Sequence, residues 1–191
     1  MLIRHAIGAI ALMMIASASS FAQANFTTAV ESVEARFEPA QAQPGQTVTL
    51  KLTVTLKPGW HTYPTVQPDE NARAQSNKIG FPTAGAVIFV DKLQEPANPE
   101  SKAEPVLDIQ KLLFYSGKAT WERKAIVALD ATGELAIKLP NVKLMVCDEN
   151  TCLPPKTVPV TAKLTVAGAP VAIEARYRDE VAKALQAKPT P

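Results

Sequence analysis

Hydrophobic and polar residues alternate along most of the middle of the chain. The clearest case is residues 47–57, where valines and leucines from Val48 to Leu56 alternate with threonines and lysines. Strict alternation predicts a β-strand with one buried face. Proline–glycine pairs at 44–45 and 58–59 mark turns at both ends of this strand. Related patterns of apolar and β-branched residues predict further strands at residues 33–38, 87–90, 119–129, 135–137, 142–146 and 158–166.

The predicted strands are short, are separated by turn signals and have no helix between them. This pattern predicts an all-β domain, an antiparallel sandwich, over residues 25–170. Residues 65–82 and 91–111 lack regular alternation. We expect both to be long loops of the kind that often carry function.

The end of the chain changes to helical spacing. Four apolar residues recur at this spacing: Ile173, Tyr177, Val181 and Leu185. They predict a short helix at residues 172–187. Residues 171–191 are therefore expected to form a short helix followed by a frayed tail.

The first 24 residues have the pattern of a secretory signal peptide. Arg4 and His5 precede an apolar run, and Ala22-Gln23-Ala24 fits the small-residue cleavage pattern. We expect cleavage after Ala24 and export to the periplasm. No later stretch reaches 18 apolar residues, so we expect no membrane insertion after cleavage.

Charge and composition exclude several classes of function. The 191 residues carry 20 basic and 18 acidic side chains, a balance that excludes nucleic-acid binding driven by bulk charge. The signal segment holds one of the two histidines, which leaves His61. One histidine and two cysteines cannot form a multi-histidine or four-cysteine metal site. We expect neither a metal nor another cofactor.

The two cysteines frame a short polar turn. An apolar strand runs into Cys147, four polar residues follow, and Cys152 begins the return. A four-residue loop can join antiparallel strands, and residues facing each other across such a pair lie within disulfide reach. Closing so short a loop stabilises a fold by only about 2 kcal/mol. The spacing alone leaves a structural and a redox role open.

Three segments resemble a known family. Residues 57–63 read KPGWHTY, residues 114–121 read FYSGKATW, and residues 146–160 read VCDENTCLPPKTVPV. In order and separation they resemble the N-terminal periplasmic domain of the thiol:disulfide interchange protein DsbD, from about residue 30 to residue 165. The resemblance implies an immunoglobulin-like sandwich with one redox-active cysteine pair, here without the family's membrane and thioredoxin-like domains.

The resemblance also implies partners and residue roles. A thioredoxin-like or DsbD-type membrane protein would donate electrons, and oxidised periplasmic thiol proteins, including cytochrome c maturation factors, would accept them. Cys152 would form the mixed disulfide with a partner and Cys147 would resolve it. Further roles are implied for four residues: Phe114 as the tip of a cap loop, Tyr115 flanking that loop, and His61 and Tyr63 lining the site.

The chain departs from the family in two places, and other functions remain open. The loop between the cysteines is shorter than in better-known members, and Leu112 and Leu113 replace acidic residues expected before the cap phenylalanine. One alternative is a non-catalytic binding module with an inert disulfide. Another is a Cu(I)-handling protein, since soft sulfur ligands select Cu(I); its ligands would be Met145, Cys147, Cys152 and His61. In each case we expect a monomer.

Overall fold

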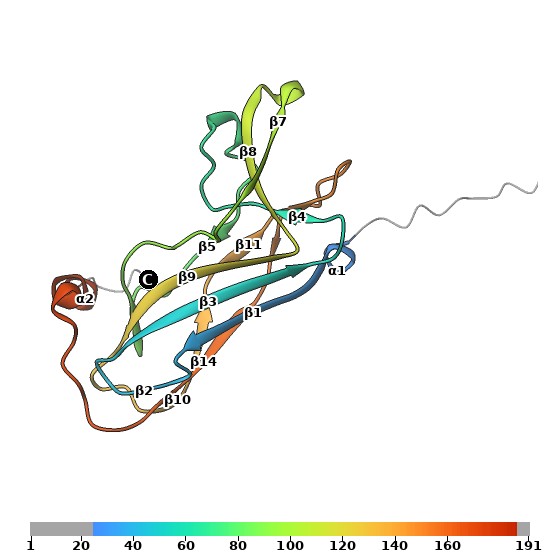
Figure 1. Ribbon diagram of the computed structural model, residues 1–191. Coiled ribbons are helices and arrows are strands. Elements are labelled where there is room, and N and C mark those ends of the chain that lie inside the picture. Colours follow the sequence, from blue (N-terminus) through green and yellow to red (C-terminus); the bar gives the residue numbers. More distant parts are fainter. Residues whose placement is uncertain (1–24, 187–191) are drawn as a thin grey trace, which may run out of the picture.

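The chain folds into two packed β layers, which overlap in the view of Figure 1. The structure is a computed structural model that describes residues 25–186; the predicted signal segment and residues 187–191 of the predicted tail lie outside the described residues. The first layer is an antiparallel sheet in the order β1-β3-β9-β6. Its strands are β1 (Val30–Glu38), β3 (Thr47–Leu56), β9 (Lys118–Val127) and β6 (Val87–Phe89).

The second layer contains two short sheets, β10-β14-β2 and β13-β11-β5. All its pairs are antiparallel except β14 with β2. Strand β14 packs against β1 of the first layer. The fold predicted from the sequence, an all-β immunoglobulin-like antiparallel sandwich with a short C-terminal helix, is confirmed. The strands are β2 (Gln41–Ala42), β5 (Lys78–Ile79), β10 (Gly133–Leu139), β11 (Val142–Leu144), β13 (Lys156–Thr157) and β14 (Val160–Val166).

The core lies between the layers, and β3 supplies much of it. The alternating residues Val48 to Leu56 point inward and are almost fully buried, as the pattern predicts. Trp121 of β9 lies opposite Leu52 and has no exposed surface. Thr49 and Thr53, on the other face of β3, are also buried because β3 lies between β1 and β9. Their hydroxyls hydrogen-bond to Lys124 and Thr120 of β9, at 2.8 and 3.0 Å.

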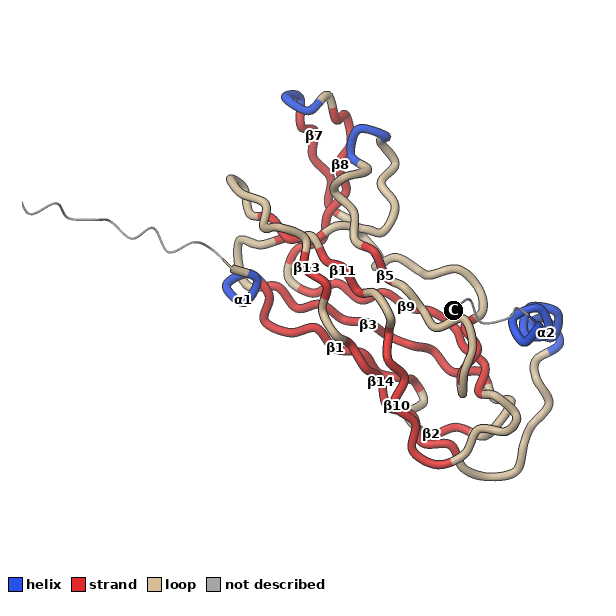
Figure 2. The backbone as a smooth tube through the Cα atoms, turned by 180° about the vertical axis from the view of Figure 1, so that it is seen from behind, coloured by secondary structure: helices blue, strands red, loops and turns tan. Residues whose placement is uncertain are grey.

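A fourth sheet, in the order β12-β4-β8-β7, carries a hairpin that projects from the sandwich. Figures 1 and 2 show β7 and β8 extending away from both layers. The turn between them contains the short 3-10 helix η2, and a neighbouring loop contains η1. The elements are β4 (His61–Thr62), η1 (Glu70–Ala72), β7 (Glu100–Glu104), η2 (Pro105–Leu107), β8 (Ile109–Ser116) and β12 (Val146–Cys147).

The prediction of an irregular loop at residues 91–111 is wrong, because β7, η2 and the start of β8 occupy its second half. Strand β7 projects from the sandwich and buries no side chain, so its sequence, ESKAE, has no apolar alternation. A β-bulge in β8 also breaks the period of two there. Pro105 at the start of the turn and Asp108, with a φ of 53°, close the hairpin.

The two ends of the described chain are helical. The first is α1 (Phe26–Ala29), and the last is η3 (Ala175–Tyr177) followed by α2 (Arg178–Gln186). Tyr177 and Val181 pack against the sheet, whereas Leu185, which we expected on the same face, is 67% exposed. Leu129 is likewise 55% exposed, because β9 ends at Val127, before the predicted end.

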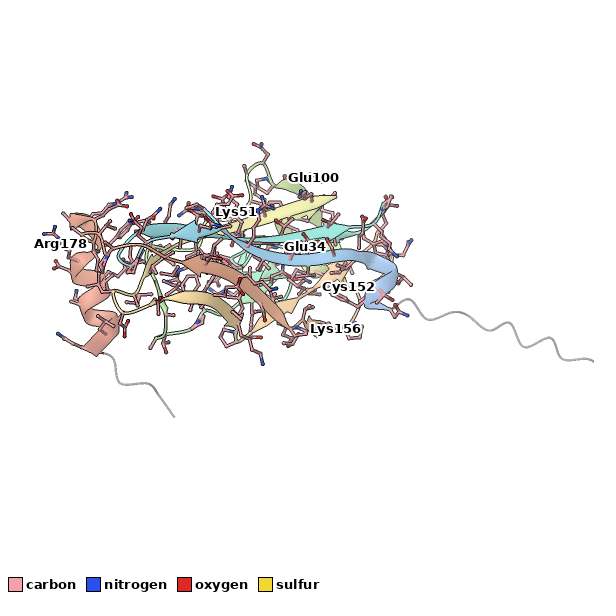
Figure 3. The ribbon with its side chains drawn as sticks, turned by 90° about the horizontal axis from the view of Figure 1, so that it is seen from below. Glu34, Lys51, Glu100, Cys152, Lys156 and Arg178 are labelled. Carbon is pink, nitrogen blue, oxygen red and sulfur yellow. A yellow bond between two sulfur atoms is a disulfide. The ribbon has the colours of Figure 1, made fainter. Side chains whose placement is uncertain are left out.

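Figure 3 places α2, marked by Arg178, at the end of the molecule opposite Cys152. Among residues 25–186, no helix has the length and apolar character needed to cross a bilayer.

Candidate functional site

The two cysteines face each other at the base of a tight hairpin, as their spacing predicts. A disulfide joins Cys147 to Cys152, with their Cα atoms 4.0 Å apart. Backbone hydrogen bonds flank the pair, from the N–H of Leu153 to the carbonyl of Val146 and from the N–H of Asp148 to the carbonyl of Thr151, both 2.9 Å. The cysteines therefore form a non-hydrogen-bonded pair, the position with the closest side chains in an antiparallel ladder.

The two halves of the disulfide lie in different environments. Cys147 is 1% exposed, whereas Cys152 is an exposed residue. Cys147 belongs to a small apolar cluster that is separate from the main core. The cluster contains Tyr63, Ala72, Ile109, Leu112 and Cys147, with the half-buried Phe114 and Met145 packed against it. Cys152 is therefore the exposed residue of the pair and Cys147 the buried one.

The acidic turn between the cysteines is held by its own carboxylate. Oδ1 of Asp148 accepts hydrogen bonds from the backbone N–H groups of Asn150 and Thr151, at 2.8 and 2.6 Å. These two bonds lower the pKa of Asp148, so the side chain is ionised at neutral pH. Asp148 thus shapes the turn, while Glu149 beside it is exposed.

The register of the sheet β12-β4-β8-β7 brings His61 beside the buried cysteine. Cys147 of β12 pairs with His61 of β4, which in turn pairs with Ser116 of β8. Residues paired across strands project on the same side of a sheet, so the imidazole and the sulfur share one face. Nε2 of His61 lies 3.1 Å from the hydroxyl oxygen of Tyr63, a hydrogen-bond distance.

Phe114 completes this face from β8. Its ring centroid lies 4.9 Å from that of His61, and Nζ of Lys102 lies 5.8 Å from the same ring. Phe114 is half-buried and lies within a strand, not at the tip of a loop. The structure therefore brings together Phe114, His61 and Tyr63 around Cys147.

Tyr115 lies elsewhere. It points from the opposite face of β8 into the main core, where its ring makes an edge contact with Trp121 at 6.0 Å between centroids. Burial raises the pKa of Tyr115 to about 12, with the carboxylate of Glu95 acting in the same direction. The structure does not bring Tyr115 to the disulfide.

The bulge in β8 supplies two residues that sequence reasoning missed. The three residues of β7 from Lys102 to Glu104 lie opposite four residues of β8, from Ile109 to Leu112. The extra residue turns both Ile109 and Leu112 toward Cys147, where they are 0% and 2% exposed. The sequence carries one signal for these two residues. Ile109 and Leu112 are apolar and lie three positions apart, in a stretch that otherwise lacks alternation.

Two polar side chains that the sequence did not single out hold the site in place. Nε2 of Gln67 donates to the carbonyl of Leu113 at 2.9 Å, and its Oε1 accepts from the Leu113 N–H at 3.0 Å. Asn77 is 1% exposed; it donates to the carbonyl of Tyr63 at 2.6 Å and accepts from the N–H of Met145 at 2.9 Å. Gln67 thus anchors β8, and Asn77 links the strands that carry His61 and Cys147.

A groove of about 240 Å³ opens at the disulfide. We call it the disulfide groove; it is lined by Tyr63, Gln75, Lys102, Glu104, Leu107, Leu112 and residues 147–152. A second groove of about 380 Å³ adjoins it and contains His61 and Phe114. Lys102 and Glu149 line both grooves, so the two are continuous.

The comparisons with known proteins find similarity among solved structures. No protein-family model and no curated protein matches the chain. Among solved structures, it is similar to the N-terminal periplasmic domain of ScsB from Proteus mirabilis, at 18% sequence identity and a TM-score of 0.41. The match covers 79% of this chain and 52% of that one, so the chain spans about half the length of the solved chain.

The described residues offer little for a metal. No group of three or more histidine, cysteine, aspartate or glutamate side chains within residues 25–186 is arranged to hold a metal ion. Met145 does pack in the same cluster as Cys147. Both cysteine sulfurs, however, are engaged in the disulfide, so the copper alternative would first require its reduction.

Burial sets the protonation states of His61 and Tyr63, which lie beside the disulfide. Burial, and to a lesser degree the charge of Lys102, lowers the pKa of His61, against the opposing carboxylates of Asp148, Glu100 and Glu104. Burial raises the pKa of Tyr63 to about 12. At neutral pH the imidazole and the phenol are therefore both uncharged.

This lowered pKa predicts a loss of stability in mild acid. Above about pH 6.5 His61 is neutral in both folded and unfolded chains; below it, the unfolded chain binds the proton first. The free energy of unfolding should fall by at most about 1.4 kcal/mol between pH 7.5 and pH 5.5. Urea unfolding across this range should show the fall in the unmodified protein and a flatter profile for His61→Phe. Equal losses in both proteins would exclude His61 as the cause.

Proposed function

We propose that the protein exchanges thiols and disulfides with other proteins through Cys147 and Cys152. The observation that carries the proposal is the unequal exposure of the pair, with Cys152 exposed and Cys147 buried at a groove that both residues line. Such an arrangement supports different roles for the two sulfurs. An incoming thiolate reaches the exposed sulfur, and the buried sulfur leaves and later returns.

The exchange conserves electrons and protons. A thiolate of a reduced partner attacks Sγ of Cys152, the Cys147–Cys152 bond breaks, and Cys147 leaves as a thiolate that takes up a proton. The partner's second thiol then attacks the mixed disulfide, so the partner is oxidised and both cysteines are reduced. The reverse sequence reduces the disulfide of an acceptor protein.

The surroundings of the pair support a redox role over a structural one. A bridge that closes so short a loop contributes only about 2 kcal/mol. The sandwich has an extensive core formed by β3, β9 and the second layer, so we expect it to fold without this bridge. The inert-disulfide alternative has no comparable observation in its favour.

We propose further that the donor is thioredoxin-like or a DsbD-type membrane protein, and that the acceptors are oxidised thiol proteins of the periplasm. The signal pattern of residues 1–24 and the resemblance to the DsbD domain support this assignment. Cys152 is then the sulfur bound to the partner, Cys147 the resolving sulfur, and Phe114, with His61 and Tyr63, a cover over the buried side.

The reduction potential of the pair tests the proposal. Equilibration in dithiothreitol redox buffers should give a value above about −300 mV, and reduced thioredoxin, at about −270 mV, should reduce the pair at least partly. Coupling to thioredoxin reductase and NADPH measures that step directly. A potential below this limit, with no NADPH consumed, would favour the inert-disulfide alternative.

A further inference from the structure

The turn of the projecting hairpin exposes two adjacent apolar side chains. Val106 is 96% exposed and Leu107 is 54% exposed. Val66 is 73% exposed and precedes Gln67, whose side chain is hydrogen-bonded to β8. Three of the five exposed large apolar side chains among residues 25–186 therefore lie on the hairpin or on the segment beside it. Single exposed apolar residues are ordinary, but a group beside a reactive bond indicates a contact surface.

The exposed turn is continuous with the disulfide groove. Leu107 lines the same groove as Cys147 and Cys152. A protein whose sulfur reaches Cys152 would therefore be placed beside Leu107 as well. The hairpin projects beyond the sandwich, as Figures 1 and 2 show, so a partner can approach it without touching either layer.

The rim of the two grooves is acidic. Four acidic residues and two lysines line the grooves: Glu100, Glu104, Asp148 and Glu149, and Lys57 and Lys102. Lys102 is already paired with Glu104, at 2.8 Å. His61, which also lines the second groove, is uncharged at neutral pH because burial lowers its pKa. The surface around Cys152 is therefore net negative and complements a basic partner.

We propose that Val106 and Leu107, together with this acidic rim, are the docking surface for a partner protein whose reactive cysteine is flanked by basic and apolar residues. This rests on the proposed thiol–disulfide exchange and adds the chemistry that selects the partner. The apolar turn contacts the apolar residues of the partner segment, while Glu149 and the other acidic residues of the rim attract its basic residues.

Two short peptides test the selection. In one, a cysteine is flanked by arginine and leucine; in the other, by glutamate and leucine; each is activated as a mixed disulfide with thionitrobenzoate. Cys152 of the reduced protein attacks the peptide sulfur and releases coloured thionitrobenzoate. Cys147 then displaces the peptide thiol, so the protein's two thiols are oxidised and the activated disulfide is reduced. Each rate is divided by the rate of the same peptide with free dithiothreitol.

The arginine peptide should react about tenfold faster than the glutamate peptide at low salt, and the ratio should shrink as salt is added. Glu149→Lys should remove most of the ratio. The double substitution Val106→Ser, Leu107→Ser should slow both leucine-containing peptides severalfold relative to the same variant's rate with Ellman's reagent. Glu134→Lys and Leu185→Ser change exposed residues outside both grooves, and we expect them to leave the rates unchanged.

The two proposals fail in different ways. Equal rates for both peptides, or the same slowing by Leu185→Ser as by the hairpin double variant, would overturn the docking surface while leaving exchange intact. A reduced protein that reacts with neither the peptides nor Ellman's reagent would overturn the proposed exchange itself.

Discussion

A protein carrying Cys147→Ser is expected to form a long-lived mixed disulfide at Cys152, whereas Cys152→Ser is expected to form almost none. An attacking thiolate must reach a sulfur directly. Cys152 is exposed, but Cys147 is 1% exposed beneath the cluster of Tyr63 and Leu112. Cys147→Ser also removes the thiol that would release the partner, so the trapped species persists.

Two measurements check this asymmetry. The single thiol of each reduced variant is first timed against Ellman's reagent, where Cys147→Ser should react at least about tenfold faster, since buried cysteines are inert. Each variant is then mixed with a thioredoxin lacking its resolving cysteine and activated as a thionitrobenzoate adduct. Non-reducing gels should show the mixed disulfide for Cys147→Ser only.

A serine in an apolar cluster could loosen the site, so a second variant is needed. A hydroxyl buried without a partner costs about 1–3 kcal/mol, whereas Cys147→Ala leaves Cys152 equally exposed without that cost. Both variants should trap the partner to the same extent. If Cys152→Ser reacts as fast as either of them, burial does not decide which sulfur is attacked.

The parts of the fold that could be predicted are those whose faces differ in burial. Strand β3 alternates because one face lines the core, and the structure has it at Thr47–Leu56, within one residue of the prediction. The cysteine hairpin could also be predicted from the sequence, because an apolar strand is followed by four polar residues that fit one tight turn. Strong local patterns of this kind survive in the folded chain.

The projecting hairpin could not be predicted for the opposite reason. Strand β7 has solvent on both faces, so no pattern of burial is imposed on its sequence. The exposed Val106 and Leu107 of its turn resemble core residues in sequence alone. The pairing of β7 with β8 is local, but no alternating pattern in β7 marks it.

The two residues that hold the site in place, Gln67 and Asn77, could not be predicted for a related reason. Gln67 and Asn77 occur in a polar stretch, residues 65–82, in which the other polar residues are exposed or half-buried. Their burial follows from hydrogen bonds to Leu113, Tyr63 and Met145, which only the tertiary fold brings near. Composition cannot separate a buried amide from an exposed one, since both read as loop residues.

Replacing Asn77 by alanine is therefore expected to lower the free energy of unfolding by about 3 kcal/mol. The amide is 1% exposed and makes three close hydrogen bonds, to the carbonyl of Tyr63 at 2.6 Å, from the N–H of Met145 at 2.9 Å, and to the hydroxyl of Thr62 at 3.0 Å. Alanine leaves a buried carbonyl and a buried N–H without partners, which costs more than the bonds themselves contribute.

Asn71 provides the matched control. It lies in the same stretch, is exposed, and makes one side-chain hydrogen bond, to the carbonyl of Asp108 at 2.8 Å. Asn71→Ala should cost less than about 1 kcal/mol. Urea unfolding of the two variants, at a pH where His61 is neutral, measures the difference.

The loss at Asn77 should also be local to the site. Asn77 links β4, which carries His61, to the residue before β12, which carries Cys147. Hydrogen exchange at the Met145 amide should accelerate in Asn77→Ala more than exchange within β3, and Cys147 should become more accessible to Ellman's reagent after reduction. Equal stability of the Asn77 and Asn71 variants, or exchange that accelerates uniformly, would show that this amide does not hold the disulfide strands together.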